Sequence, residues 1–282
     1  MCKIIQHLHI VLLCALCVFF APLSGHAQAN ATEFSISSSL LHFDYQEFND
    51  YGKLLDREEG YIPGLAIAIN QPVGQWLLGL TLSYHSGETA YSGQTTSGIP
   101  ITTTTRQNIV DAAVQTEYWL LTAHNLQYAP YFGLGYHLWQ RDILPTTTAG
   151  GAPVYGLFEN YSWWIGFIGI KTQLYSNDDY SCILDMRLTQ TIKPEITVDF
   201  GGNYDKAALP LGERMGARIA LPWRHRLSTD ADLLLEPSAE YYELGRSATA
   251  PLTSHGTVAG NVYEPSSKTF NYALQLGLSQ RF

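Results

Sequence analysis

The C-terminal segment, residues 270–282, alternates between apolar side chains and polar or small ones. Its apolar positions are Phe270, Tyr272, Leu274, Leu276 and Leu278. A β-strand places successive side chains on opposite faces. The segment therefore predicts a strand with one apolar face, at the length of about 9–11 residues that a tilted strand needs to cross a membrane.

The same pattern recurs along the chain and predicts ten strands. Clear alternation covers 76–85, 131–138 and 180–189, and partial alternation covers 33–45, 63–71, 107–121, 160–174, 208–221 and 229–243. Short connections near 72–74, 123–125, 176–179 and 223–225 alternate with long ones over 46–62, 86–106, 140–159, 190–207 and 244–268. Outer-membrane barrels separate periplasmic turns from external loops in this way.

We expect an all-β fold: a single antiparallel transmembrane β-barrel of ten strands, with eight or twelve left open. The polar face is rich in Gly, Ser, Thr, Asn and Gln and poor in Lys and Glu. Such a face suits a crowded lumen better than the water-exposed exterior of a soluble sandwich or lipocalin-like barrel.

The N-terminus predicts export. The apolar run 10–20 is too short to span a bilayer as a helix, and Ala27-Gln28-Ala29 is a cleavage pattern. Residues 1–29 are thus expected to be a signal peptide and residues 30–282 the barrel domain, placed in the cell outer membrane.

Composition narrows the partners and cofactors. The chain has 25 acidic and 16 basic residues, and its net charge of −9 argues against nucleic acid as a partner. Cys182 is the one cysteine that would remain after cleavage, so no disulfide, metal or redox motif is expected, and no cofactor. We expect a monomer surrounded by outer-membrane lipid and lipopolysaccharide.

The end of the chain resembles the C-terminal signature of bacterial outer-membrane proteins, in which alternating apolar residues close on a terminal Phe. The resemblance implies recognition by the barrel assembly machinery, carried by Leu274, Leu276, Leu278 and Phe282.

Ten strands with five external loops also resemble the omptin family of outer-membrane proteases. Omptins cut peptides with two aspartates on one loop facing an Asp–His pair on another. The matching stretch here, 88–106, contains no Asp, and the fourth long stretch has Asp199 and Asp205 without a His. The resemblance therefore implies a shape and not the protease chemistry.

Charged residues on the lumen face predict an internal network. They are Asp111, Glu117, Asp185, Arg187, Arg214, Arg218, Glu236 and Glu240. A ten-stranded barrel is narrow inside, so these charges are expected to pair and plug the lumen; a selective pore or a catalytic set is the alternative.

Histidine gives the candidate catalytic residues, because its ordinary pKa suits a base at neutral pH. His85 and His137 fall on lumen faces, and Ser83, Ser86, Glu88 and Asp142 are near them in sequence.

Two further groups of residues have non-catalytic interpretations. Trp119, Trp139, Trp163, Trp164, Tyr61, Tyr84 and Tyr161 are expected at the membrane interfaces, and Asp50, Asp56, Glu58 and Glu59 on a solvated first loop that could meet divalent cations.

The leading hypothesis is a barrel without catalysis, with a structural or surface-interaction role. The alternatives are an outer-membrane hydrolase acting on lipid A, acyl esters or peptides, and a small channel.

Deletion of Phe282 tests the resemblance of the C-terminus. We expect the truncated protein to assemble poorly, because the assembly signal loses its last aromatic residue. The measurement is the amount of faster-migrating, unheated band in the outer-membrane fraction. Normal insertion of the truncated protein would contradict the prediction.

Overall fold

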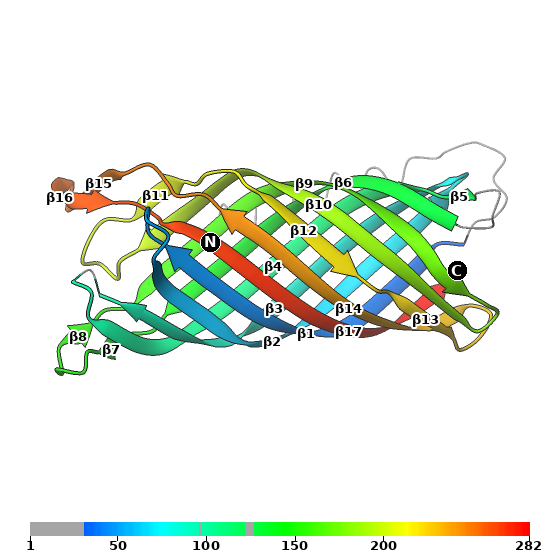
Figure 1. Ribbon diagram of the computed structural model, residues 1–282, viewed down its shortest axis with the longest axis horizontal. Coiled ribbons are helices and arrows are strands. Elements are labelled where there is room, and N and C mark those ends of the chain that lie inside the picture. Colours follow the sequence, from blue (N-terminus) through cyan, green and yellow to red (C-terminus); the bar gives the residue numbers. More distant parts are fainter. Residues whose placement is uncertain (1–30, 96, 122–126) are drawn as a thin grey trace.

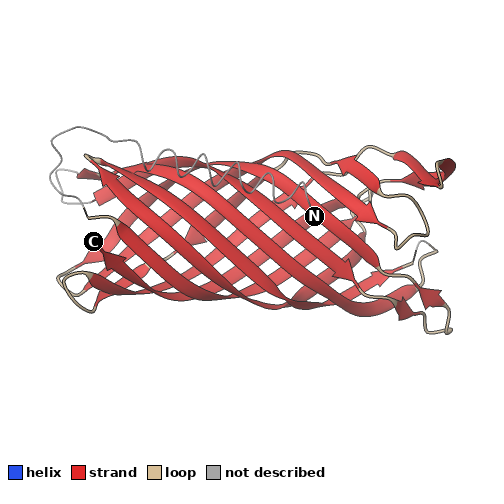
Figure 2. Ribbon diagram, turned by 180° about the vertical axis from the view of Figure 1, so that it is seen from behind, coloured by secondary structure: helices blue, strands red, loops and turns tan. Residues whose placement is uncertain are grey.

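The chain forms a single closed β-barrel with strands tilted to its long axis (Figure 1, Figure 2). The structure is a computed structural model that describes residues 31–95, 97–121 and 127–282. Neighbouring strands are antiparallel throughout, and the last barrel strand pairs with the first along its whole length, from Glu33↔Arg281 to Phe48↔Ser266. The barrel therefore has no free edge among its described strands.

Ten strands form the barrel wall, as the alternation predicted, if the three pieces of the last one described are counted together. Nine are β1 (Glu33–Phe48), β2 (Leu54–Val73), β3 (Trp76–Gln94), β4 (Pro100–Tyr118), β6 (Gln127–Ile143), β9 (Leu157–Ser176), β10 (Tyr180–Asp199), β14 (Ala231–Leu244) and β17 (Ser266–Arg281). The tenth consists of three pieces, β11 (Ala207–Pro210), β12 (Met215–Ala220) and β13 (Trp223–Arg226). The short strands β5 (Leu120–Leu121), β7 (Thr146–Thr147), β8 (Pro153–Val154), β15 (Ala250–Ser254) and β16 (Thr257–Val262) lie at the two ends.

The strands run much further than predicted, and the external loops are correspondingly shorter. The connections β1–β2 and β3–β4 are only 49–53 and 95–99, where loops of 46–62 and 86–106 were expected. The hairpins β7–β8 and β15–β16 project from this same end (Figure 1). The turn expected at 223–225 is wrong as well: these residues pair with β10 and β14 as β13, and the chain turns at 227–230.

The outer wall has two zones, and their boundary places the membrane. One zone exposes apolar side chains such as Leu65, Ile168 and Leu276, each more than half exposed. Further towards the long loops the outward side chains form ion pairs, as Arg57 does with Asp44 at 2.8 Å. The 20-residue strand β2, at about 3.3 Å per residue and a tilt of about 40°, rises roughly 50 Å, about twice an apolar band of about 25 Å. The barrel thus crosses the membrane with one half and stands above it with the other.

Two lumen-facing aromatic rings lie over glycines of the neighbouring strand. Tyr131 lies opposite Gly169, and Phe167 lies opposite Gly133. A Cβ on either glycine would overlap the opposing ring. The two rings therefore lie flat against the inner face of β6 and β9, and they fill part of the narrow lumen.

The predicted signal peptide, residues 1–29, and the predicted turn at 123–125 with His124 lie outside the described residues. Within the described part of the chain, no helix is long and apolar enough to cross a membrane.

A charge on either zone of the outer wall tests the membrane boundary. We expect Leu65→Arg to destabilise the barrel by about 2–4 kcal/mol, because a guanidinium near the middle of the apolar band faces lipid. The matched change Gln140→Arg, on the polar zone, is expected to be nearly neutral. Both are measured as the temperature at which the unheated, fast-migrating band disappears, and equal losses would contradict the boundary.

Candidate functional site

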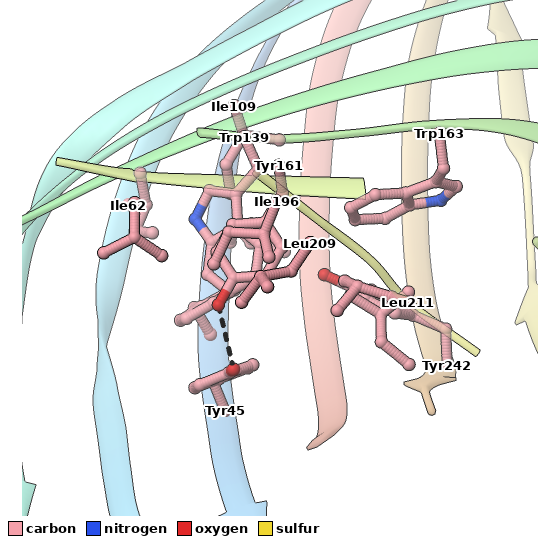
Figure 3. Packing of buried hydrophobic residues seen from close by; sticks show 14 residues of the cluster. Tyr45, Ile62, Ile109, Trp139, Tyr161, Trp163, Ile196, Leu209, Leu211 and Tyr242 are labelled. Carbon is pink, nitrogen blue, oxygen red and sulfur yellow. Dashed lines mark hydrogen bonds between the residues drawn. The ribbon is translucent and has the colours of Figure 1, made fainter. Parts of the chain in front are cut away.

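A layer of apolar and aromatic side chains closes the lumen in the half above the membrane. Trp139 of β6 packs against Phe43 of β1 with ring centroids 5.6 Å apart and stacks on Tyr161 of β9 at 4.5 Å. We call this layer the seal. Its members come from most of the barrel strands and meet across the lumen (Figure 3): Leu41, Phe43, Tyr45, Ile62, Ile109, Trp139, Tyr161, Trp163, Ile196, Val198, Leu209, Leu211, Tyr242 and Leu244.

Arg141 lies on the outer side of the seal and is completely buried. Its Nη2 and Nε donate to Glu58 Oε1 at 2.6 and 3.2 Å, and its Nη1 donates to Glu159 Oε2 at 2.7 Å and Glu47 Oε1 at 3.0 Å. The guanidinium carbon also lies 4.4 Å from the centre of the Tyr45 ring. A planar guanidinium suits such a site because its fork of donors matches carboxylates.

Two further buried carboxyls complete what we call the acid cluster: Glu47, Asp56, Glu58, Glu159 and Glu264. Asp56 lies directly opposite Glu47 in the register of β1 and β2 and accepts a hydrogen bond from Tyr91 Oη at 3.2 Å. Glu264, from the connection between β16 and β17, accepts one from Tyr161 Oη at 2.6 Å. Each of the five acids is at most 9 % exposed.

One guanidinium cannot compensate five buried carboxylates, so the acid cluster retains protons. The cluster lies above the apolar band, because Gln140 and Asp142, which flank Arg141, are polar and face outward. Burial, with repulsion from Glu47 and Glu58, raises the pKa of Glu159 to about 7, although Arg141 lowers it. Burial also raises the pKa of Glu264 and of Asp56, with Glu47 adding to both.

Glu58 is the member with the most donors. It accepts hydrogen bonds from Thr105 Oγ1 at 3.0 Å and Thr89 Oγ1 at 3.3 Å, and a short one from Gln107 Nε2, in addition to the two from Arg141. Gln107 in turn accepts a bond from the Trp139 indole at 2.7 Å. The acid cluster and the seal therefore form one connected structure.

The two candidate histidines lie directly beneath the seal. His85 Nε2 lies 2.8 Å from Ser39 Oγ, and His137 Nδ1 lies 2.5 Å from Asp111 Oδ1, with the His137 ring stacked on Trp163 at 4.0 Å. His85 thus has a hydroxyl and His137 a carboxylate, but neither imidazole bonds to both, as a Ser–His–Asp arrangement requires.

The residues expected to assist these histidines do not assemble around them. Ser86, Glu88 and Asp142 face the outside of the barrel: Ser86 bonds Asn108 at 2.9 Å, and Glu88 and Asp142 both contact Arg106. Ser83 alone faces the lumen with the histidines, 3.5 Å from Asp111. The sequence analysis grouped these residues because they are near one another in the chain. Successive side chains of a strand point to opposite faces, so Ser86, Glu88 and Asp142 lie outside the barrel while His85 and His137 lie inside it.

The other lumen charges mostly pair with one another, between strands that are adjacent or have one strand between them. Arg218 contacts Asp185 at 3.6 Å and also Glu236, Arg187 contacts Glu240 at 3.4 Å, and Glu117 contacts Lys171. Asp185 additionally accepts a hydrogen bond from Tyr131 Oη at 2.5 Å.

Arg214 does not join this network. It is exposed at the break between β11 and β12, and its guanidinium bonds the carbonyl of the adjacent Glu213 at 3.0 Å. A bulge between Ile192 and Glu195 on the neighbouring strand, with Lys193 at a φ of +50°, accompanies this break. The bulge interrupts the alternation on which the lumen assignment of Arg214 depended.

Two sequence interpretations of side-chain position are corrected. Trp139, Trp163 and Tyr161 lie in the seal, not at a membrane interface, because they share the parity of the lumen face. Asp56 and Glu58 are buried members of the acid cluster, not part of a solvated loop, because β2 begins at Leu54. Leu274, Leu276, Leu278 and Phe282 are all exposed on the outer wall, and their role in assembly stays a prediction.

Sequence reasoning missed Arg141, Glu47 and Glu159, which lay in or beside the predicted long loops, and Ser39. The alternation of faces along the strand was the signal that could have found Arg141, because this residue continues the lumen-facing series of His137 and Trp139. The partner of each residue depends on the register across the lumen, which alternation alone does not supply.

Asp199 and Asp205, which lie in the predicted fourth external loop, have local structural roles. Asp205 accepts hydrogen bonds from Thr253 Oγ1 at 2.6 Å and from the backbone amides of Gly256 and His255 at 2.9 and 3.2 Å, which fastens the β15–β16 hairpin. Asp199 pairs with Lys206 at 2.8 Å.

Comparison with known proteins supports the fold. No protein-family model matches the chain, and no curated protein sequence matches it. Among solved structures, the outer membrane protease OmpT from Escherichia coli is similar with a TM-score of 0.62 at 12 % identity, covering 93 % of this chain and 100 % of that one. The transport unit of the autotransporter AIDA-I from Escherichia coli has a TM-score of 0.44 at 9 % identity, covering 94 % of both chains. The closed ten-stranded barrel and its similarity to OmpT show the fold of a Gram-negative outer-membrane β-barrel.

Arg141→Met tests the electrostatic role of the guanidinium. The change keeps an apolar stem but leaves buried carboxylates without a cation, so we expect a loss of about 3–5 kcal/mol in stability. The loss should shrink in acid, where the carboxyls are neutral. Arg106→Met, on the exposed outer wall, is the matched control and should cost at most about 1 kcal/mol. Equal temperatures of band loss for the two variants would contradict the prediction.

Proposed function

We propose that this chain is a non-conducting, non-catalytic outer-membrane barrel that acts as a scaffold for contacts at the cell surface. The observation that carries the proposal is the seal. Side chains such as Phe43, Ile62, Trp139 and Ile196 are at or near complete burial where an open pore would need water. A lumen closed by apolar groups with no exposed surface offers no path for ions.

The lumen beneath the seal supports the same view. Its acidic and basic groups pair with each other, as Arg187 does with Glu240 and Arg218 with Glu236, rather than lining a path with one sign of charge. The histidines His85 and His137 lie on the membrane side of the seal, each with half of the partners that a hydrolase site needs.

The external end favours a role in surface contact. Each of its five connections exposes a large apolar or aromatic side chain: Tyr51, Ile99, Tyr155, Tyr204 and Val258. Exposed tyrosines are common where proteins bind one another. The long wall raises these side chains above the membrane surface.

Conductance measurement tests the proposal. We expect purified, heat-modifiable protein to produce no single-channel steps in a planar bilayer, because the seal excludes water. The double change Phe43→Ala and Trp139→Ala removes two of its rings and serves as the comparison, with occasional openings expected. Regular steps from the unaltered protein would overturn the non-conducting claim.

Hydrolysis is tested separately with the same preparation. We expect no turnover of a short-chain ester or an unstructured peptide above that of His137→Ala. Turnover that disappears in this variant would contradict a non-catalytic role and would favour the hydrolase alternative.

A further inference from the structure

The fifth external connection, residues 245–265, is attached to the barrel at both of its ends. Gly245 and Gly212 exchange two backbone hydrogen bonds of 2.7 and 2.9 Å. The Ser247 amide donates to the Glu264 carbonyl at 3.0 Å, and the Glu264 amide donates to Ser247 Oγ at 2.8 Å. The two ends of the connection are therefore closed on each other, with Glu264 facing the lumen.

The Glu264 side chain enters the acid cluster. It is 7 % exposed and accepts the Tyr161 hydrogen bond described above. The ionisable groups that influence it or its cluster come from five strands: Tyr45 and Glu47 from β1, Asp56 and Glu58 from β2, Tyr91 from β3, Arg141 from β6, and Glu159 and Tyr161 from β9. All but one of these are acids, so the site as a whole resists a further negative charge.

The single cation among these groups is already engaged elsewhere. The Arg141 nitrogens bond Glu58, Glu47 and Glu159, and within the described part of the chain Glu264 forms no ion pair. An ionised Glu264 would consequently be a buried charge without compensation, which is costly, whereas a neutral carboxyl fits.

The other contacts of the connection lie nearer water. Asp205, which accepts the hydrogen bonds from Thr253, His255 and Gly256 described above, is only partly buried. Arg246 Nε lies 3.1 Å from Asp50 Oδ1, and Asp50 is 64 % exposed. Exposed ion pairs contribute little. Two apolar residues of the connection, Ala250 and Val262, pack against the seal and are only partly buried. Glu264 is therefore the ionisable side chain through which the segment is anchored in the acid cluster.

We propose that Glu264 is a pH-sensitive latch: its neutral carboxyl holds residues 245–265 over the outer side of the seal, and its ionisation releases this segment.

The direction of the pH dependence follows from the site. Burial and the neighbouring carboxyls raise the pKa of Glu264 above its ordinary value of 4.5 in the closed state, so the closed segment binds a proton that the released segment gives up. The closed state is fully favoured below that ordinary value. It loses stability as the pH rises through the raised pKa of Glu264.

Spin-label distances in the whole barrel test the latch. One nitroxide is attached at Val258→Cys on the β15–β16 hairpin and one at Ala90→Cys on β3, in a Cys182→Ser background, with the protein in nanodiscs. Val258 is 66 % exposed, and Ala90 is exposed on a strand paired on both sides. We expect one narrow distance distribution at about pH 5 and a broader, shifted one at about pH 9.

Two variants decide whether Glu264 is responsible. Glu264→Gln keeps the shape and stays neutral, so its distribution should be narrow at both pH values. Glu195→Gln is the matched control and should respond like the unaltered protein. Glu195 is an exposed outer-wall acid that accepts a hydrogen bond from Ser162 at 3.4 Å. The heat-dependent gel shift confirms that each variant is folded. A distribution that does not change with pH in the unaltered protein overturns the proposal without any variant, and so does a Glu264→Gln protein that still responds to pH.

Discussion

The half of the barrel above the membrane depends on one completely buried guanidinium, that of Arg141. Removing an arginine and several carboxyls from solvent is costly, and the cost is offset only if nearly every donor finds an acceptor. Arg141 meets this condition through Glu58, Glu47 and Glu159 and through the ring of Tyr45. Without it, the ionised carboxyls above the seal would repel one another with no cation to compensate them.

The seal and the acid cluster reinforce each other. The indole of Trp139 donates to Gln107, and Gln107 donates to Glu58, so the apolar layer is fixed to the polar one by hydrogen bonds. Because the seal excludes water, the charges above it interact in a medium of low dielectric constant, where both attraction and repulsion are strong. The same layer separates the histidine pairs below from the external surface, which is the main structural reason to favour a scaffold over a hydrolase.

Much of the fold could be predicted from the sequence, since alternation assigns each residue to a face. Leu276 outward and Asp111 inward follow from parity alone. The alternation also predicts that Trp139 faces the lumen. The sequence analysis placed it at a membrane interface because tryptophan is common there, and that residue preference gave the wrong face. The long loops were overestimated because above the membrane the outward positions become charged, so that Arg57 and Glu59 resemble a loop although they alternate as a strand does.

The candidate site was less accessible to sequence reasoning. Contacts inside the barrel join residues that are distant along the chain: Arg141 and Glu58 are 83 positions apart, and Ser39 and His85 are 46 apart. Such pairs depend on barrel closure and register. Irregularities also matter, as the bulge beside Lys193 shows for Arg214.

The height of the wall has a consequence for what this protein can meet. The sugars of outer-leaflet lipids form a layer around any protein that ends at the membrane surface, and that layer hides short loops. In the proposed role of surface contact, a barrel that carries its own ion-paired wall through this layer displays side chains such as Tyr51 and Tyr155 beyond it. Rigid strands, and not long flexible loops, provide that reach, so the tips arrive with a fixed spacing and lose little entropy when they bind.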